Sequence, residues 1–165
     1  MRLFHSVFFI LSICAIFSCQ TQKDKTTIYL VRHAEKDTTV DQYNPPLTQE
    51  GYERAENLKS ELSDENIKYI FSTKFQRNKN TVGPLANGLK KKIHIYEYHK
   101  WQTMLDSIKT ISGNHLICGH GDNLLPMIDY LGANVGKNKL EHQEYDNLFK
   151  VIIKEREVIG EIIKY

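Results

Sequence analysis

The segment Ile28-Tyr29-Leu30-Val31 runs directly into Arg32-His33-Ala34-Glu35, so a short and nearly all-apolar run ends in a charged group. Such a run is typical of a strand that is covered on both faces of a sheet. His33 then follows the carboxyl end of that strand, and open α/β sheets bind their ligands outside the carboxyl ends of the strands. The segment therefore predicts a buried strand that carries a histidine to a binding site.

A second histidine follows a similar run late in the chain. His115-Leu116-Ile117-Cys118 leads into Gly119-His120-Gly121-Asp122, which again indicates a strand ending in a loop with a histidine. If both strands lie in one parallel sheet, their loops bring the two imidazoles to the same edge. Two imidazoles at one site suit phosphoryl chemistry.

The rest of the chain alternates between helical and strand patterns. Thr48 can cap a helix whose apolar stripe is Ala55, Leu58 and Leu62. Residues 36–46 form a polar loop where a binding lid would sit. The pattern predicts further strands over 67–71, 92–98, 147–154 and 157–164, and further helices over 77–87, 102–109 and 122–131. It predicts an α/β three-layer sandwich: a mostly parallel central sheet with helices on both faces and an antiparallel C-terminal hairpin.

The first residues resemble an export signal. Arg2 precedes a mainly apolar stretch over residues 3–17, which is shorter than the roughly 20 residues of a membrane-spanning helix. Ile16-Phe17-Ser18-Cys19 resembles a bacterial lipobox, so we expect cleavage before Cys19 and acylation of this cysteine. An ordinary cleaved export signal and an uncleaved anchor are the alternatives.

These features divide the chain into three parts: a signal peptide over 1–18, a lipidated tether over 19–25 and one domain over 26–165. The chain of 165 residues has a formal net charge of +2, and loss of Arg2 with the signal leaves a nearly neutral protein. This balance argues against nucleic acid as the main partner. We expect a protein held to the membrane by its lipid anchor in the bacterial cell envelope, in the periplasm or at the outer membrane.

The three cysteines agree with this division. Cys14 lies in the signal and Cys19 would carry the lipid, which leaves only Cys118 in the domain. No disulfide can then form within the domain. Because Cys118 belongs to an apolar strand, we expect a core residue rather than a nucleophile.

Four short motifs occur in order, each beside the predicted element that suits it. They are Arg32-His33 after a strand, Pro46-Leu47-Thr48-x-x-Gly51, Ser72-x4-Arg77-x3-Thr81, and Gly119-His120-Gly121 after a strand. This order resembles the histidine phosphatase superfamily, also called phosphoglycerate mutase-like, over residues 28–131. The resemblance implies that His33 is the nucleophile that becomes phosphohistidine. It implies that Arg32, Arg77 and His120 complete the phosphate pocket.

The chemistry of these side chains agrees with those roles. A phosphoryl group in transfer spreads negative charge over its oxygens, so catalysis is mostly positioning and electrostatics. Arginine can fork onto such oxygens in a way that lysine cannot. A nucleophilic imidazole must be neutral, and neighbouring guanidinium groups lower its pKa. His120, if protonated, would donate to the same oxygens, and no metal or cofactor is needed.

The proton donor for the leaving group is less clearly marked. Many superfamily members place a glutamate in the loop after the third strand, and Glu97 lies in the corresponding stretch of this chain. Glu35, beside the nucleophile, and Asp122, after His120, are the other candidates. A chain without such a donor would resemble the phosphohistidine phosphatases, which cleave an easily protonated P–N bond.

These observations predict a metal-independent phosphohydrolase of the histidine acid phosphatase type. It would act through a phosphohistidine on a small phosphomonoester or sugar phosphate in the cell envelope. Phosphohistidine phosphatase-type activity and a phosphomutase are alternative enzymatic functions. A lipoprotein that binds phosphate or phosphosugar without turnover, or a purely structural envelope protein, are non-enzymatic ones.

Overall fold

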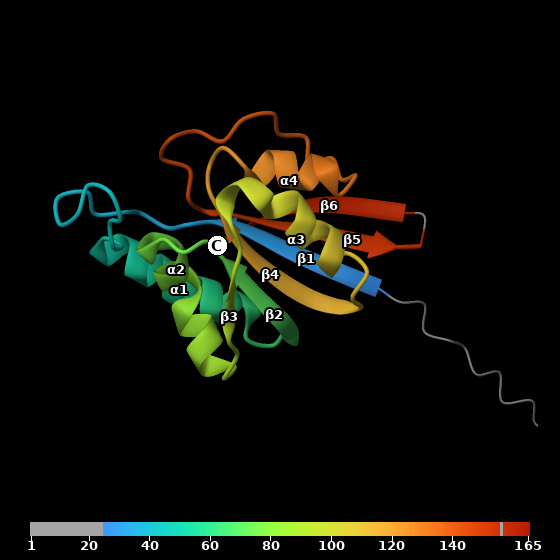
Figure 1. Ribbon diagram of the computed structural model, residues 1–165, viewed down its shortest axis with the longest axis horizontal. Coiled ribbons are helices and arrows are strands. Elements are labelled where there is room, and N and C mark those ends of the chain that lie inside the picture. The colour runs from blue at the N-terminus through green and yellow to red at the C-terminus, as the bar shows by residue number, and fades with distance from the viewer. Residues whose placement is uncertain (1–24, 156) are drawn as a thin grey trace, which may run out of the picture.

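The computed structural model of the chain describes residues 25–155 and 157–165 (Figure 1). The predicted signal peptide and Cys19 lie outside these residues. The first strand, β1 (Lys25–Arg32), already includes Lys25, which the sequence assigns to the tether. No helix within the two described ranges is long and apolar enough to cross a bilayer.

A single six-stranded sheet forms the centre of the domain, with its strands in the order β3-β2-β4-β1-β5-β6. β1 pairs in parallel with β4 (Gly113–Gly119), β4 with β2 (Ile67–Ser72), and β2 with β3 (Ile93–Ile95). β5 (Asn147–Lys154) lies antiparallel to β1, and β6 (Glu157–Lys164) lies antiparallel to β5. The predicted mostly parallel sheet with a C-terminal antiparallel pair is therefore confirmed.

Helices cover both faces of this sheet, as the sequence predicts. α1 (Gln49–Leu62) and α2 (Gln76–Gly88) lie on one side, and α3 (Trp101–Ile108) and α4 (Leu124–Tyr130) lie on the other (Figure 1). The side chains of β1 alternate between the two layers: Ile28 and Leu30 pack in the core under α3 and α4, whereas Tyr29 and Val31 pack with α1 and α2. Each such fully buried side chain contributes roughly 1.5–3 kcal/mol of apolar burial.

The third strand is shorter than its alternating pattern predicts. It spans Ile93–Ile95 rather than residues 92–98. Its partner β2 ends at Ser72, whose carbonyl accepts from the backbone N–H of Tyr96 at 3.0 Å, and the chain then turns into a 3₁₀ helix at Tyr98–Lys100. An edge strand has only one neighbour, so it ends where that neighbour ends, whatever its own pattern.

The helix after His120 also begins later than predicted, at Leu124 rather than at residue 122. The side-chain oxygen of Asn123 accepts from the backbone N–H of His120 at 2.8 Å. This bond holds residues 120–123 as a tight turn, so the helix starts only after it. The turn keeps His120 at the end of β4.

The start of α1 explains the second sequence motif. Thr48 caps the helix by accepting from the backbone N–H of Gly51 at 3.1 Å, a bond worth about 1 kcal/mol. A Cβ atom at Gly51 would lie 2.4 Å from the carbonyl oxygen of Glu35, so only glycine fits there. That carbonyl also accepts from the backbone N–H of Thr48 at 2.9 Å. The motif thus fastens α1 to the loop that follows His33.

Candidate active site

The carboxyl ends of β1, β2 and β4 bring the predicted pocket residues together. His33 directly follows β1, Thr73 follows β2 and His120 follows β4. The rings of His33 and His120 have their centroids 5.5 Å apart at an interplanar angle of 70°. Only 5 % of His33 and 7 % of His120 are exposed. The two imidazoles therefore share one nearly buried site.

The hydrogen bonds of His33 fix which of its ring nitrogens is free. Nδ1 lies 2.8 Å from the carbonyl oxygen of Ala34. Because a carbonyl oxygen only accepts, Nδ1 must carry the hydrogen, and this leaves the lone pair of Nε2 available. The backbone N–H of His33 donates to the carbonyl of Gly119 at 3.1 Å, which ties the loops after β1 and β4 together. Nε2 is therefore the nucleophilic atom that this geometry provides.

Thr81 of the third sequence motif connects α2 to the same loop. Its hydroxyl donates to the carbonyl of Arg77 at 2.7 Å and accepts from the backbone N–H of Ala34 at 2.9 Å. Asn78, one residue after Arg77, donates to the carbonyl of Gly119 at 2.9 Å. The first turns of α2 are therefore bonded to both histidine loops.

Burial makes both histidines neutral in the folded protein. It lowers the pKa of His33 to about 3, with further lowering by the charges of His120, Arg77 and Arg32. It lowers the pKa of His120 to about 4, and here Arg77 adds the largest charge effect. Neutral His33 can act as a nucleophile at physiological pH. His120 is also neutral in this state, and the negative charge of a bound phosphate would raise its pKa.

The two arginines each keep a buried donor unpaired among the described residues. Arg32 Nε and Arg77 Nε are both buried without a hydrogen-bond partner. Arg77 lies at the start of α2 with its guanidinium 4.4 Å from the ring centre of Phe75, and burial lowers its pKa. Because an unpaired buried donor costs about 1–3 kcal/mol, an anion that accepts from both groups would be bound favourably. These donors suit phosphate oxygens.

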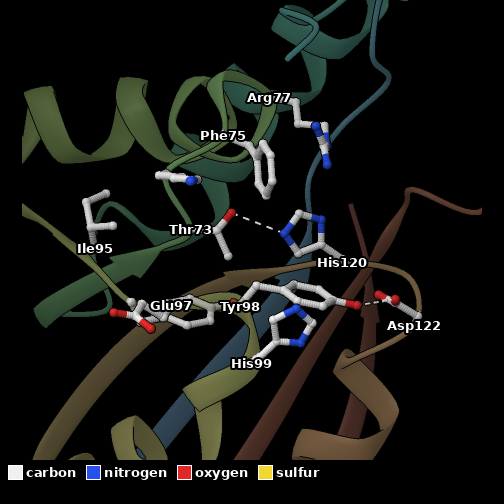
Figure 2. Close-up of a pocket in the computed structure, with 11 residues that line it drawn as sticks. Thr73, Phe75, Arg77, Ile95, Glu97, Tyr98, His99, His120 and Asp122 are labelled. Carbon is white, nitrogen blue, oxygen red and sulfur yellow. Dashed lines mark hydrogen bonds between the residues drawn. The ribbon is translucent and has the colours of Figure 1, made fainter. Parts of the chain in front are cut away.

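A cavity of about 700 Å³ opens beside His120 and Arg77. Figure 2 shows Phe75 and Tyr98 on two sides of His120, whose Nε2 lies 3.1 Å from the hydroxyl of Thr73. The ring centroids of Phe75 and Tyr98 lie 5.6 and 5.2 Å from that of His120. The cavity is lined by Thr73, Lys74, Phe75, Arg77, Ile95, Tyr96, Glu97, Tyr98, His99, His120 and Asp122. It provides room for the leaving part of a substrate.

The three candidate acids lie in different places. Glu97 and Asp122 line the cavity, where Asp122 accepts from the hydroxyl of Tyr98 (Figure 2). Glu97 follows β3, the position that the resemblance gives to the acid, and it pairs with Lys100 at 2.9 Å. Glu35 does not line the cavity, and both of its oxygens accept from Arg54 of α1 at 2.6–2.9 Å. This ion pair argues against Glu35 as the proton donor.

Sequence reasoning missed several residues of the site. Phe75 and Tyr98 flank His120, and Tyr145 lies with its ring centroid 6.1 Å from that of His33. Phe75 and Tyr98 each lie three residues after the end of a strand, a position that could have indicated them, but Tyr145 follows a polar stretch without periodicity. Cys118 is fully buried, as expected for a core residue, and burial raises its pKa to about 12. Among residues 25–155 and 157–165, no three His, Cys, Asp or Glu side chains are grouped so as to hold a metal ion.

Comparison with known proteins agrees with this arrangement. The family described as histidine phosphatase superfamily (branch 1) matches residues 28–101, a range that includes Arg32, His33 and Arg77 but ends before His120. No curated protein sequence matches the chain.

Solved structures share the fold at low sequence identity. An α-ribazole phosphatase from Shigella flexneri has a TM-score of 0.64 at 16 % identity, over 84 % of this chain and 96 % of that one. A phosphoglycerate mutase from Bacillus anthracis has a TM-score of 0.63 at 15 % identity, over 87 % and 93 %. A phosphoserine phosphatase variant from Entamoeba histolytica, in complex with phosphoserine, has a TM-score of 0.55 at 15 % identity, over 82 % and 94 %.

The chain is therefore similar to this superfamily over residues 28–101, and it shares the fold of the solved structures over most of its length.

Proposed function

We propose that the protein is a phosphohydrolase that transfers the phosphoryl group of a small phosphomonoester to His33 and then to water. The observation that carries the proposal is the free Nε2 of a neutral His33, held beside His120 and two arginines with unpaired buried donors. Arg32, Arg77 and His120 would stabilise the charge of the phosphoryl group during transfer. None of the steps below draws on a metal ion.

In the first step, the lone pair of His33 Nε2 attacks phosphorus and the bond from phosphorus to the leaving oxygen breaks. The leaving alkoxide takes a proton from a carboxylic acid and departs as an alcohol. In the second step, a water oxygen attacks phosphorus and the P–N bond breaks, which returns the electron pair to Nε2. The carboxylate accepts one proton of that water, and inorganic phosphate leaves.

Glu97 is the proton donor that we favour, with Asp122 as the alternative. Glu97 lines the cavity and lies in the loop after β3. The carboxylate of Asp122 already accepts from Tyr98, which makes it a better fixed acceptor than a mobile donor. The test compares Glu97→Gln with Asp122→Asn on an alkyl and an aryl phosphate. Loss of the donor should lower kcat about 10²–10⁴-fold on the alkyl ester but far less on the aryl ester, whose leaving group needs little protonation.

A phosphohistidine substrate is the second candidate. Its support is that the side chain of Glu97 is 72 % exposed and paired with Lys100, so that solvent and Lys100 compete with a leaving group for this carboxyl. The nitrogen leaving group of phosphohistidine is easily protonated, so it needs no such acid. A protein that releases phosphate from a phosphohistidine peptide but leaves alkyl phosphates intact would favour this candidate.

The decisive experiment for the enzyme uses the full chain in detergent with an aryl phosphate and a chelator. We expect turnover and, after an alkaline quench, an alkali-stable and acid-labile phosphate on His33. His33→Ala should abolish both signals, whereas His94→Ala on β3 is the matched control and should keep them. Turnover that survives His33→Ala would exclude this mechanism. Phosphate binding without any turnover would favour a binding protein, and transfer to a second substrate molecule would favour a mutase.

We also propose that a lipid on Cys19 holds the enzyme in the cell envelope. The support is the lipobox-like Ile16-Phe17-Ser18-Cys19 after a short apolar stretch. Metabolic labelling with a radioactive fatty acid should label the wild-type chain but not Cys19→Ala. Equal labelling of the two would contradict the anchor and leave the enzymatic proposal intact.

A further inference from the structure

The segment 141–145 lies outside the family match, yet it contacts the phosphate pocket through its backbone. Nη1 of Arg32 donates to the carbonyl oxygens of Glu141 and His142 at 3.1 Å and approaches that of Glu144 at 3.3 Å. One end of the guanidinium is thus bound to a loop more than one hundred residues away in sequence. The opposite edge, which carries Nε, has its buried donor unpaired.

The ring of Tyr145 covers one face of the Arg32 guanidinium. The central carbon of the Arg32 guanidinium lies 4.3 Å from the centre of the Tyr145 ring, and that ring is 9 % exposed. The same ring lies beside His33, at 6.1 Å between centroids. The backbone of Gly121 packs closely against the same guanidinium, since a Cβ atom there would lie 3.2 Å from both Nε and the central carbon of Arg32. The guanidinium therefore lies between the tyrosine ring and the turn that carries His120.

The loop that supplies these contacts is itself fixed by Glu144. Its carboxylate pairs with Lys137 at 2.8 Å and accepts from the side chain of Asn147 at 2.7 Å and from the backbone N–H of Glu141 at 3.1 Å. These contacts lower the pKa of Glu144 to about 2, so the carboxylate stays charged at neutral pH. The carbonyl oxygens that accept from Arg32 therefore belong to a loop that the contacts of Glu144 hold in place.

We infer that Tyr145 is a positioning residue for phosphoryl transfer, which with the carbonyls of segment 141–144 holds Arg32 so that its Nε edge serves the phosphate. A guanidinium binds two oxygens best through one edge, and binding the other edge to carbonyls leaves only one orientation. This inference rests on the proposed function. It assigns a role in that site to a part of the chain that no motif marks.

The test measures kcat, KM and the binding of inorganic phosphate for the full chain and five variants. Tyr145→Leu removes the ring and should weaken phosphate binding and lower kcat/KM by about 10- to 30-fold, the range of a desolvated cation–π contact. Tyr145→Phe keeps the ring and should recover most of that loss. Tyr130→Leu is the matched control, because Tyr130 lies on α4 with its hydroxyl bonded to Asp106, and it should behave as wild type.

The last two variants, Arg32→Lys and Arg32→Lys with Tyr145→Leu, separate positioning from general stability. In an Arg32→Lys background, Tyr145→Leu should lower kcat/KM less than threefold, because the guanidinium that Tyr145 orients is already absent. A full additional loss in that background, or wild-type phosphate binding by Tyr145→Leu, would overturn the inference while the proposed function stands. If the wild type binds phosphate without turnover and Tyr145→Leu still weakens that binding, the proposed function fails and the positioning role is supported.

Discussion

The charges of Arg32 and Arg77 both act on His33 and His120, but the chain holds the two arginines in different ways. Arg32 is enclosed by the backbone carbonyls of segment 141–144 and the ring of Tyr145. The guanidinium of Arg77 rests on Phe75 and makes no hydrogen bond to any residue in 25–155 or 157–165. One arginine is fixed by distant tertiary contacts, and the other only by its own helix and one neighbouring ring.

Two identical side chains in one pocket are therefore not expected to respond alike to substitution. For Arg32, the shape of the guanidinium matters twice, because it donates to carbonyl oxygens on one side and, under the proposed function, would donate to phosphate on the other. For Arg77, charge and reach matter most, because no group within the described ranges accepts from its guanidinium. The comparison can therefore be tested by replacing each with lysine, which keeps the charge and removes the fork.

The largest effect is expected for Arg32→Lys. A lysine ammonium at this position would be drawn to the carbonyls of segment 141–144 and lost to the phosphate, so kcat/KM should fall about 10³-fold, as for loss of a transition-state donor. In Arg77→Lys, kcat/KM should fall only about 10²-fold, because the lysine ammonium can still point into the cavity. Steady-state kinetics on one aryl phosphate, with thermal unfolding as the control for folding, measure both. Equal losses, or a larger loss at Arg77, would contradict the claim that the two arginines are held in different ways.

A second expected effect concerns the histidines that both arginines face. In the unfolded chain, histidine titrates near pH 6.5, whereas in the folded protein the pKa of His33 is about 3 and that of His120 about 4. Between these values the unfolded state binds more protons, so stability rises with pH and is lost as pH falls below about 6.5. Each of these two histidines should lower the free energy of unfolding by about 2 kcal/mol when the pH falls from 8 to 5.

Urea unfolding at pH 8 and pH 5 measures this dependence. His33→Gln removes one of the two groups, so the variant should lose about 2 kcal/mol less than the wild type over the same interval. The matched control is His94→Gln, on the partly exposed edge strand β3, which should lose as much as the wild type. An unchanged pH dependence in His33→Gln would mean that His33 takes up its proton in the folded state near the ordinary histidine value.

Much of the site lies where local sequence signals are strong. The two apolar runs mark strands whose ends carry His33 and His120, and in a parallel sheet these ends lie on one edge. Thr81 and Gly51 were noticed only as parts of a resemblance, and the structure gives each a contact with the loop after His33. The order of elements was enough to predict the three layers and the closing antiparallel pair.

The remainder depends on contacts that have no local signature. Arg32 bonds to carbonyl oxygens, which every residue has, so nothing in the side chains of segment 141–144 indicates a role. The position of Glu35 near His33 in sequence makes it a candidate acid, but Arg54, nineteen positions later, holds its carboxylate in an ion pair. The length of β3 was set by its neighbour rather than by its own pattern. Such features follow from the assembled fold.

The smallest expected effect concerns two glycines, one beside Arg32 and one in the helix that carries Arg77. In Gly121→Ala, the new methyl group would lie 3.2 Å from the guanidinium of Arg32, which its carbonyl partners and Tyr145 prevent from moving freely. We expect kcat/KM to fall about tenfold, or about 1.4 kcal/mol, with little change in melting temperature. Gly83→Ala in α2, the helix of Arg77, meets no atom within 4 Å and should keep full activity, with a gain of about 0.5–1 kcal/mol in stability. Unchanged activity in Gly121→Ala would show that Arg32 can move away from the new methyl group without loss of function, and the interpretation of Arg32 as a fixed arginine would then fail.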